Sequence, residues 1–362
     1  MRLHLFSFRV AALIVSIFGS SFFANSNRFP IFRKTLYSTQ EVYLKNFTIQ
    51  KTMLEIQHKT RLFLSMEFIF RLQVWIFLFV MLQNVRLFLT KQSGARRSDQ
   101  LWFTLVHESP LNIRIGDNLR DKVNFTVSYR LDSSILSPYG IYEPLVKSDG
   151  PNTRYPLPAR NFAKGKSKMV AWFVSNCQSK TPRSVYAHEL SRHIEVDIFG
   201  KCGSKLCPRS SEKLCFKLLR EEYKFYLSFE NSLCKYYVTE KFYLNALQND
   251  VIPIVMGASI EEYQSLAPPY SFIHVDQFES PFKLAEYLKY LDGNDTAYNE
   301  YFAWREHGEV KNWHGDPHCE ICLLAHTVQY LHPSWVSDVS SWWNDACKDR
   351  RLRWDPSTFH SD

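Results

Sequence analysis

The chain has 362 residues, of which 45% are hydrophobic and 15% aromatic, and its formal net charge at pH 7 is +8. This composition excludes an intrinsically disordered chain, and the length allows two domains with a buried core each. The positive charge is moderate and no recognisable nucleic-acid module accompanies it, so we expect no nucleic-acid partner.

The N-terminus predicts a membrane segment. Residues 10–24 are apolar and follow Arg2 and Arg9, a layout typical of a signal anchor. A cleavable signal peptide has a similar layout, but we favour an anchor that ends near residue 27. A second apolar block, residues 72–82, is short for a membrane span and favours a buried strand or helix, with a second span or a gene-model artefact as alternatives.

Apolar strands that end in polar loops follow along the chain. Residues 100–106 predict a strand just before Glu108, which by spacing alone is an ordinary polar residue at a strand end. Residues 168–203 predict a β-α-β unit in which Ser175 and Asn176 form the loop after the first strand. The helix residues expected to face inward are Val185, Leu190 and Ile194.

Residues 225–257 predict a strand, a polar loop, a helix and a buried strand. The first strand ends at Glu230, Asn231 and Ser232, whose side chains compete with backbone hydrogen bonds. Thr239 is a plausible N-cap for the helix, and the apolar run VIPIVMG follows it. A second strand and amphipathic helix over residues 271–292 complete an alternating pattern. That pattern predicts a parallel sheet covered on both faces, with a ligand at the carboxyl ends of its strands.

Charged side chains open two of the predicted helices. Arg183 stands where the helix dipole disfavours a cation, so either an anionic ligand or solvent exposure is expected there. Lys241 lies beside first-turn N–H groups that attract a phosphate, and Glu240 is free to accept sugar hydroxyls. The alternative for this pair is a capped surface helix with a solvated ion pair. The usual glycine-rich dinucleotide and ATP motifs are missing from the sequence.

The cysteines and sequons indicate passage through the secretory pathway. All eight cysteines fall between Cys177 and Cys347, which predicts disulfides of unknown connectivity. For Cys319 and Cys322 we favour a structural disulfide over half of a zinc site or a redox pair. The candidate glycosylation sites are Asn46, Asn124 and Asn294.

Five sequence blocks resemble the α-1,3-fucosyltransferases of glycosyltransferase family 10. They are SNCQSKTPR, HIEVDIFGKCG, YKFYLSFENSLCKYYVTEKF, SFIHVDQFESP and YFAWR, and the resemblance extends over about residues 100–346. The cysteine-containing forms are most similar to the invertebrate and plant enzymes that modify the N-glycan core. The resemblance implies an α/β fold of the GT-B type, in which two Rossmann-like domains face a cleft.

The resemblance also implies roles for individual residues. Glu108, in the motif Glu-Ser-Pro, is the expected general base, and Glu240 is expected to hold the fucose. Arg183 and Lys241 are expected to neutralise the pyrophosphate of GDP-fucose. The other residues expected at the donor are Asn231, Ser232, Tyr237, Ser175 and Asn176.

The expected chemistry needs one base and no metal. An inverting transfer uses a single carboxylate to take the acceptor proton while the leaving group departs from the opposite face of the sugar. The leaving pyrophosphate is stabilised either by a divalent cation or by fixed cationic side chains. Because the sequence has no Asp-x-Asp pattern, we expect no metal site and no required cofactor, although a stimulatory divalent ion stays compatible with this scheme.

The predicted protein is a single-pass type II Golgi membrane protein with a luminal catalytic part. Its expected partners are GDP-fucose, a glycan or glycoprotein acceptor, and the membrane. The alternatives are an anchored paralogue that binds nucleotide sugar or glycan without turnover, which the atypical region ahead of residue 100 favours, and a fucosyltransferase with another acceptor. The predicted segments are a tail and anchor (1–27), a stem and poorly patterned region (28–98), an acceptor-side domain with truncation as the alternative (99–164), a GDP-fucose-binding domain (165–346) and a C-terminal tail (347–362).

Overall fold

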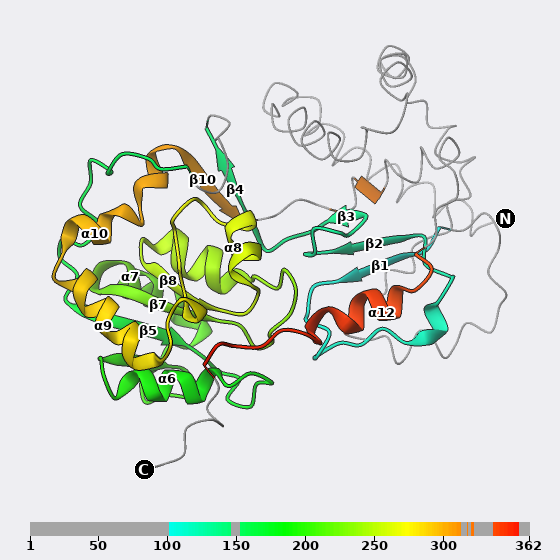
Figure 1. Cartoon of the computed structure of the whole chain (residues 1–362), viewed down its shortest axis with the longest axis horizontal. Coiled ribbons are helices and arrows are strands. Elements are labelled where there is room, and N and C mark those ends of the chain that lie inside the picture. Colours follow the sequence, from blue (N-terminus) through cyan, green and yellow to red (C-terminus); the bar gives the residue numbers. More distant parts are fainter. Residues whose placement is uncertain (1–100, 146–152, 313–316, 318–319, 322–335, 355–362) are drawn as a thin grey trace, which may run out of the picture. The chain divides into compact units, whose positions relative to one another are not determined.

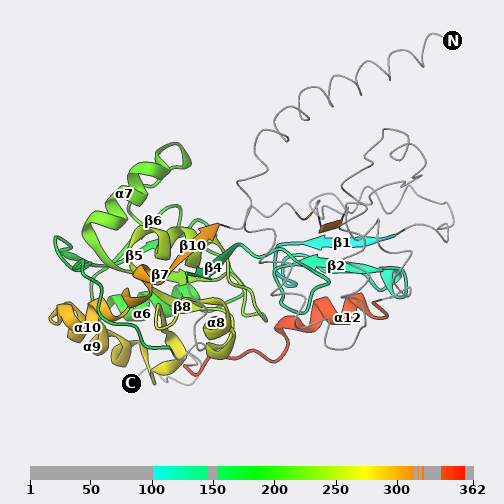
Figure 2. The same cartoon turned by 90° about the horizontal axis from the view of Figure 1, so that it is seen from above.

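The computed structural model describes residues 101–145, 153–312, 317, 320–321 and 336–354 (Figures 1 and 2). The chain divides into two compact units, Met1–Gln73 and Val74–Asp362, and all described residues belong to the second. The predicted anchor, the stem, the apolar block 72–82, Asn46, Cys319 and Cys322 lie outside the described residues. Within the described part of the chain, none of the helices combines the length and the apolar character that a membrane crossing requires.

A five-stranded parallel sheet forms the larger part of the described fold. Its spatial order is β6-β5-β7-β8-β9, so β6 lies at the edge of the sheet and β5, which precedes it in the sequence, lies between β6 and β7. This is a doubly wound order, and the direction of winding reverses between β5 and β7. The strands are β5 (Lys168–Phe173), β6 (Val196–Phe199), β7 (Tyr223–Phe229), β8 (Ile252–Met256) and β9 (Ile273–His274).

Helices cover both faces of this sheet, as the alternating pattern predicts (Figures 1 and 2). Phe225 and Leu227 of β7 point into the core that contains α6 and α9, whereas Tyr226 packs with Leu219 of α7 on the other face. Because helices cover the two faces, the loops that connect strands and helices lie at the ends of the strands. Polar residues can therefore occupy the carboxyl edge. The helices of this part are α6 (Arg183–Ser191), α7 (Glu212–Glu222), α8 (Ile260–Leu266), α9 (Pro281–Asp292) and α10 (Asp295–Glu300).

A smaller parallel sheet contains the first described strands. It has the order β1-β2-β3, and α12 lies alongside β1 and β2 (Figures 1 and 2). Trp343 of α12 is fully buried with Val106 and Tyr129, and its indole Nε1 donates to the carbonyl of Ile113 over 2.8 Å. The elements are β1 (Phe103–Val106), β2 (Phe125–Ser128), β3 (Ile135–Leu136) and α12 (Val339–Asn344), while β4 (Gly140–Pro144) pairs antiparallel with β10 (Gly308–Asn312).

Two local predictions were wrong. Val185 is 52% exposed, because α6 turns Arg183, Tyr186 and Leu190 inward and Val185 falls on the opposite face. The helix expected after Thr239 is a π-helix, η4 (Lys241–Ala246), followed by the 3-10 turn η5 (Leu247–Asn249), and no side chain caps it. The boundary between the predicted domains stays a prediction, although α12 packs against the segment named acceptor-side.

Three disulfides are present among the described residues, which confirms the expectation for six of the eight cysteines. They join Cys177 to Cys202, Cys207 to Cys215, and Cys234 to Cys347. The first links the loops that follow β5 and β6, and the third links the loop after β7 to the turn that follows α12. Two of the three therefore brace loops at the carboxyl edge of the larger sheet.

Candidate functional site

Arg183 fastens the carboxyl ends of β5 and β7 together at the point where the winding reverses. Its Nη1 donates to the carbonyl of Phe229 over 3.1 Å, and its Nη2 donates to the carbonyl of Asn176 over 2.6 Å. The residue is only 3% exposed, so solvation does not account for the cation. Burial lowers the pKa of Arg183 and the charge of Glu230 opposes that effect, although no carboxylate of the described residues lies within ion-pair distance of the guanidinium. An anion at this edge would supply a direct countercharge.

Lys241 lies in a network built on a buried carboxylate. Glu230, which follows β7, is completely buried, and its Oε1 accepts both the amide and the hydroxyl of Thr239 at 2.8 Å. The ammonium of Lys241 donates to the Thr239 hydroxyl over 2.8 Å and lies 3.1 Å from Glu230 Oε2 and 3.0 Å from Glu240 Oε1. Its three N–H bonds are therefore all directed at protein oxygens. The sequence pattern marks Glu230 only as a residue that ends a strand, so this role of Glu230 was not predicted.

This network excludes a solvated surface ion pair. The side chain of Lys241 is 19% exposed, whereas that of Glu240 is 47% exposed. Burial opposes the charge on Lys241, but Glu230 and Glu240 outweigh it and raise the pKa of Lys241. Burial raises the pKa of Glu230, against the effect of Lys241. Burial also opposes the charge on Glu240, but Lys241 lowers the pKa of that carboxyl below its usual value. Of the two carboxylates, Glu240 is the one that can turn toward a ligand.

The predicted base Glu108 lies next to the loop that follows β7. Tyr237 donates its hydroxyl to Glu108 Oε2 over 3.3 Å, and Asn112 donates its Nδ2 to the same oxygen over 3.0 Å. The neighbouring Ser109 shares a 2.6 Å hydrogen bond with Ser232, and both of these residues are fully buried. The predicted acceptor-side and donor-side residues are thus in direct contact, although no pattern in the sequence links them.

The remaining predicted residues occupy the same edge or the surface. Ser175 and Asn176 are exposed in the loop after β5, and Asn231 has a buried Oδ1 without a hydrogen-bond partner among the described residues. Asn124 is only 5% exposed, so the prediction of a glycan there does not fit the folded chain. Asn294 is partly exposed and uses its Oδ1 to cap α10, which leaves glycosylation at Asn294 a prediction.

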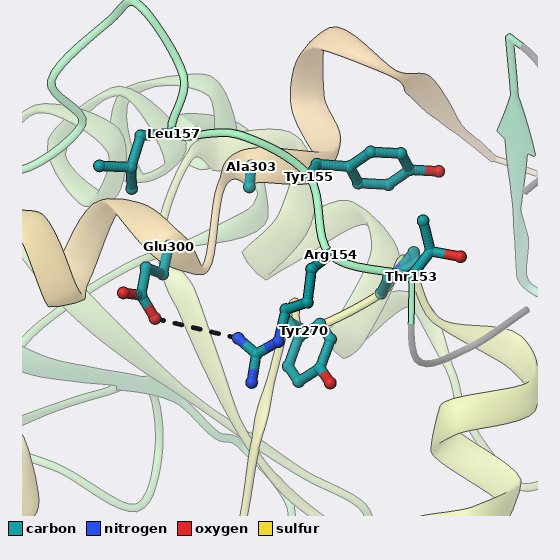
Figure 3. A pocket seen from close by; sticks show the side chains of 8 residues that line it. Thr153, Arg154, Tyr155, Leu157, Tyr270, Glu300 and Ala303 are labelled. Carbon is teal, nitrogen blue, oxygen red and sulfur yellow. Dashed lines mark ion pairs between the residues drawn. The ribbon is translucent and has the colours of Figure 1, made fainter. Parts of the chain in front are cut away.

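A cavity of about 190 Å³ lies apart from these residues (Figure 3). Within it, the guanidinium of Arg154 sits 3.4 Å above the ring of Tyr270 and 3.9 Å from a carboxylate oxygen of Glu300 (Figure 3). The loop that carries Tyr270 leads into β9 and so lies at the amino edge of the sheet, where doubly wound folds do not usually bind their substrates. The residues that line it are Thr153, Arg154, Tyr155, Leu157, Pro269, Tyr270, Glu300 and Ala303, none of which the sequence predicts to be functional.

Comparison with known proteins identifies the family. The model described as glycosyltransferase family 10 (fucosyltransferase) C-term matches residues 163–342. Alpha-(1,3)-fucosyltransferase 7 of Bos taurus is 38% identical over 251 residues, which cover 68% of this chain and 67% of the relative. The chain belongs to glycosyltransferase family 10. The resemblance inferred from the ENS and YVTEK blocks is thereby confirmed.

Other members of the family are similar over a smaller share of their length. Glycoprotein 3-alpha-L-fucosyltransferase A of Drosophila melanogaster is 42% identical over 272 residues, which cover 73% of this chain and 51% of the relative. The chain thus spans about half the length of that relative. A crystal structure of an alpha1,3-fucosyltransferase with GDP-fucose aligns with a TM-score of 0.44 and 17% identity over 64% of this chain and 76% of that chain, and a likeness so distant says nothing about individual site residues.

Proposed function

We propose that this chain is an inverting α-1,3-fucosyltransferase that moves fucose from GDP-fucose to a GlcNAc-containing glycan. The observation that carries the proposal is the position of Arg183, a buried cation without a carboxylate partner among the described residues, at the carboxyl edge between β5 and β7. Lys241 lies at the same edge, close to the loop after β7. These cations would bind the pyrophosphate and stabilise the charge that develops on it as GDP leaves.

Transfer would proceed by a single displacement. A carboxylate oxygen of Glu108 takes the proton of the acceptor hydroxyl, and the acceptor oxygen forms a bond to the anomeric carbon of fucose. The bond from that carbon to the pyrophosphate breaks, and its electron pair stays on the departing GDP. Lys241 must give up one protein oxygen to meet the pyrophosphate. Glu240 is the partner that can leave, because its side chain is the most exposed of the three and can turn to a sugar hydroxyl.

The fixed cations also support a metal-independent reaction with no required cofactor. Arg183 and Lys241 would supply the positive charge that a divalent ion supplies elsewhere. We further propose the GT-B arrangement, since both described sheets that could form its two domains are parallel. Anchoring in the Golgi membrane as a type II protein, with the catalytic part in the lumen, completes the proposal and agrees with the disulfides.

The name of the fly relative, glycoprotein 3-alpha-L-fucosyltransferase A, supports a glycoprotein acceptor. We propose the GlcNAc of an N-glycan as the acceptor sugar. The test is incubation of the full chain with labelled GDP-fucose and a panel of defined N-glycans, antennary glycans and unglycosylated peptides, followed by mass spectrometry of the products. Transfer to an N-glycan supports the proposal. Donor binding without transfer to any acceptor would favour the non-catalytic paralogue, and no affinity for GDP-fucose would refute the proposed function.

A further inference from the structure

The predicted base has a histidine as its direct neighbour. His107 follows β1 and precedes Glu108, and it is exposed. Its Nε2 shares a 2.8 Å hydrogen bond with the hydroxyl of Ser137, a residue that is only 2% exposed. Within the described part of the chain, Ser137 is the one hydrogen-bond partner of the imidazole. A buried residue therefore holds the Nε2 side of the ring, which leaves Nδ1 available to a ligand.

The ring of Tyr139 connects this imidazole to the predicted reaction site. Tyr139 donates its hydroxyl to the carbonyl of His107 over 2.7 Å, and the two ring centroids are 6.0 Å apart. Its ring also lies 6.4 Å from that of Tyr237, whose hydroxyl donates to Glu108. Burial raises the pKa of Tyr139, and the charges of Glu240 and Glu108 add to this effect. Tyr139 therefore lies near His107 and near both carboxylates, which places the imidazole beside the site proposed for transfer.

The imidazole of His107 is suited to a neutral polar ligand. Desolvation lowers the pKa of His107, although a hydrogen bond with Ser137 opposes that shift. A neutral imidazole has one donor nitrogen and one acceptor nitrogen. Because the hydroxyl of Ser137 can donate or accept, Nδ1 can take either role, and a sugar hydroxyl matches both. A carbohydrate is therefore a better partner for Nδ1 than an anion such as phosphate.

We propose, on the basis of the proposed function, that His107 binds the acceptor saccharide and contributes to the choice of acceptor. Its Nδ1 forms a hydrogen bond with one hydroxyl of the acceptor while Glu108 takes the proton of the hydroxyl that reacts. Ser137 fixes the ring before the acceptor arrives, so little freedom is lost on binding. Loss of one such hydrogen bond corresponds to roughly 10-fold in affinity.

Two substitutions in the full chain separate the two ring nitrogens. The amide of His107→Asn reaches the position of Nδ1, whereas the amide of His107→Gln reaches that of Nε2 and can still contact Ser137. We expect His107→Gln to weaken binding of a glycopeptide with one defined N-glycan by roughly 10-fold, and His107→Asn by less than about 3-fold. Calorimetry in the presence of GDP measures this Kd without turnover. The Kd for GDP-fucose, measured separately, should stay at the wild-type value in both variants.

His188→Gln is the matched control. His188 is an exposed histidine of α6, and one of its ring nitrogens is likewise bonded, since Nδ1 lies 2.8 Å from the carbonyl of Ser184. This variant should leave both Kd values unchanged. Because His107 and His188 are exposed, all three variants should keep a Tm close to that of the wild type, which circular dichroism measures.

The outcomes distinguish an acceptor ligand from a purely structural contact. If His107 serves only to hold Ser137, His107→Gln should bind the glycopeptide normally and His107→Asn should bind it less tightly. That order would overturn the proposal, as would unchanged glycopeptide binding in both variants or weaker GDP-fucose binding by His107→Gln. A wild type that binds no glycopeptide would also overturn it. A wild type that binds the glycopeptide but transfers no fucose would refute the proposed function alone, and the Kd values would still test His107.

Discussion

Replacing Lys241 by Ala should weaken donor binding and destabilise the fold at the same time. The substitution removes the only cation that contacts Glu230 among the described residues, and this carboxylate is fully buried. Breaking one half of a buried ion pair costs about 3–5 kcal/mol. Because Thr239 would still donate its amide and hydroxyl to Glu230, we expect the lower end, about 3 kcal/mol. For a domain of this size, that corresponds to a fall in Tm of roughly 6–12 °C.

A second substitution separates the two effects. In Lys241→Ala/Glu230→Gln, a neutral amide replaces the buried carboxylate that has lost its cation, and the Gln oxygen can still accept from Thr239. We expect Tm to recover most of its loss, whereas the Kd for GDP-fucose stays as weak as in the single variant. Thermal unfolding followed by circular dichroism and calorimetry of donor binding measure the two quantities. Donor affinity that recovers together with Tm would mean that Lys241 acts only through stability.

The loss of stability should also depend on pH in a defined direction. Burial raises the pKa of Glu230 and Lys241 lowers it, so removal of Lys241 raises it further. A carboxyl group with a raised pKa in the folded state keeps a proton that the unfolded chain releases, so stability is lost as pH rises through that pKa. The deficit of Lys241→Ala relative to the wild type should therefore shrink between pH 7 and pH 5. An equal deficit at both values would refute an unpaired Glu230 as its cause.

Three further outcomes are expected. Glu108→Gln should bind GDP-fucose with wild-type affinity yet lose transfer by at least about 100-fold, and retained turnover would reject Glu108 as the base. Treatment with a chelator should leave substantial transferase activity, whereas complete loss restored by one specific ion would contradict the metal-independent scheme. Burial, reinforced by Arg160 and Arg305, lowers the pKa of Lys166 to about 7, so the wild type should gain stability relative to Lys166→Met as pH rises from 7 to 9. Equal Tm differences at both pH values would contradict this assignment.

Much of the larger sheet could be predicted because its signals are local. The run VIPIVMG and the strand before Glu230 are apolar, and polar loops follow the strands at the carboxyl edge. Alternation of strands and helices then fixes a parallel sheet with covered faces. The disulfide pairings could not be obtained in this way. The bond from Cys234 to Cys347 spans 113 residues, and composition carries no information about which chain segments meet.

Two departures from prediction have their cause in polar groups of the site. Thr239 was expected to cap a helix. Its amide and its hydroxyl both donate to Glu230, and the segment that follows is the π-helix η4, whose N-cap residue Glu240 makes no side-chain cap hydrogen bond. In α6, Arg183 occupies a buried position that an apolar residue would normally fill. Val185, two residues later, therefore lies on the exposed face of the helix. Local propensity fails at these positions because the polar group that contributes to the conformation lies elsewhere in the chain or itself occupies a buried helix position.

The contact between Glu108 and Tyr237 also joins segments that lie far apart in the sequence. The two residues are 129 positions apart, and either could be assigned a role from its own neighbours in the sequence. Their contact shows that the loop after β7 reaches the predicted base through Tyr237, while the same loop leads to Lys241, the cation proposed to bind the pyrophosphate. This loop is held by Glu230 and by the disulfide to Cys347. Its order would then fix the position of the donor relative to the base. Loosening the loop should therefore impair kcat and donor affinity jointly.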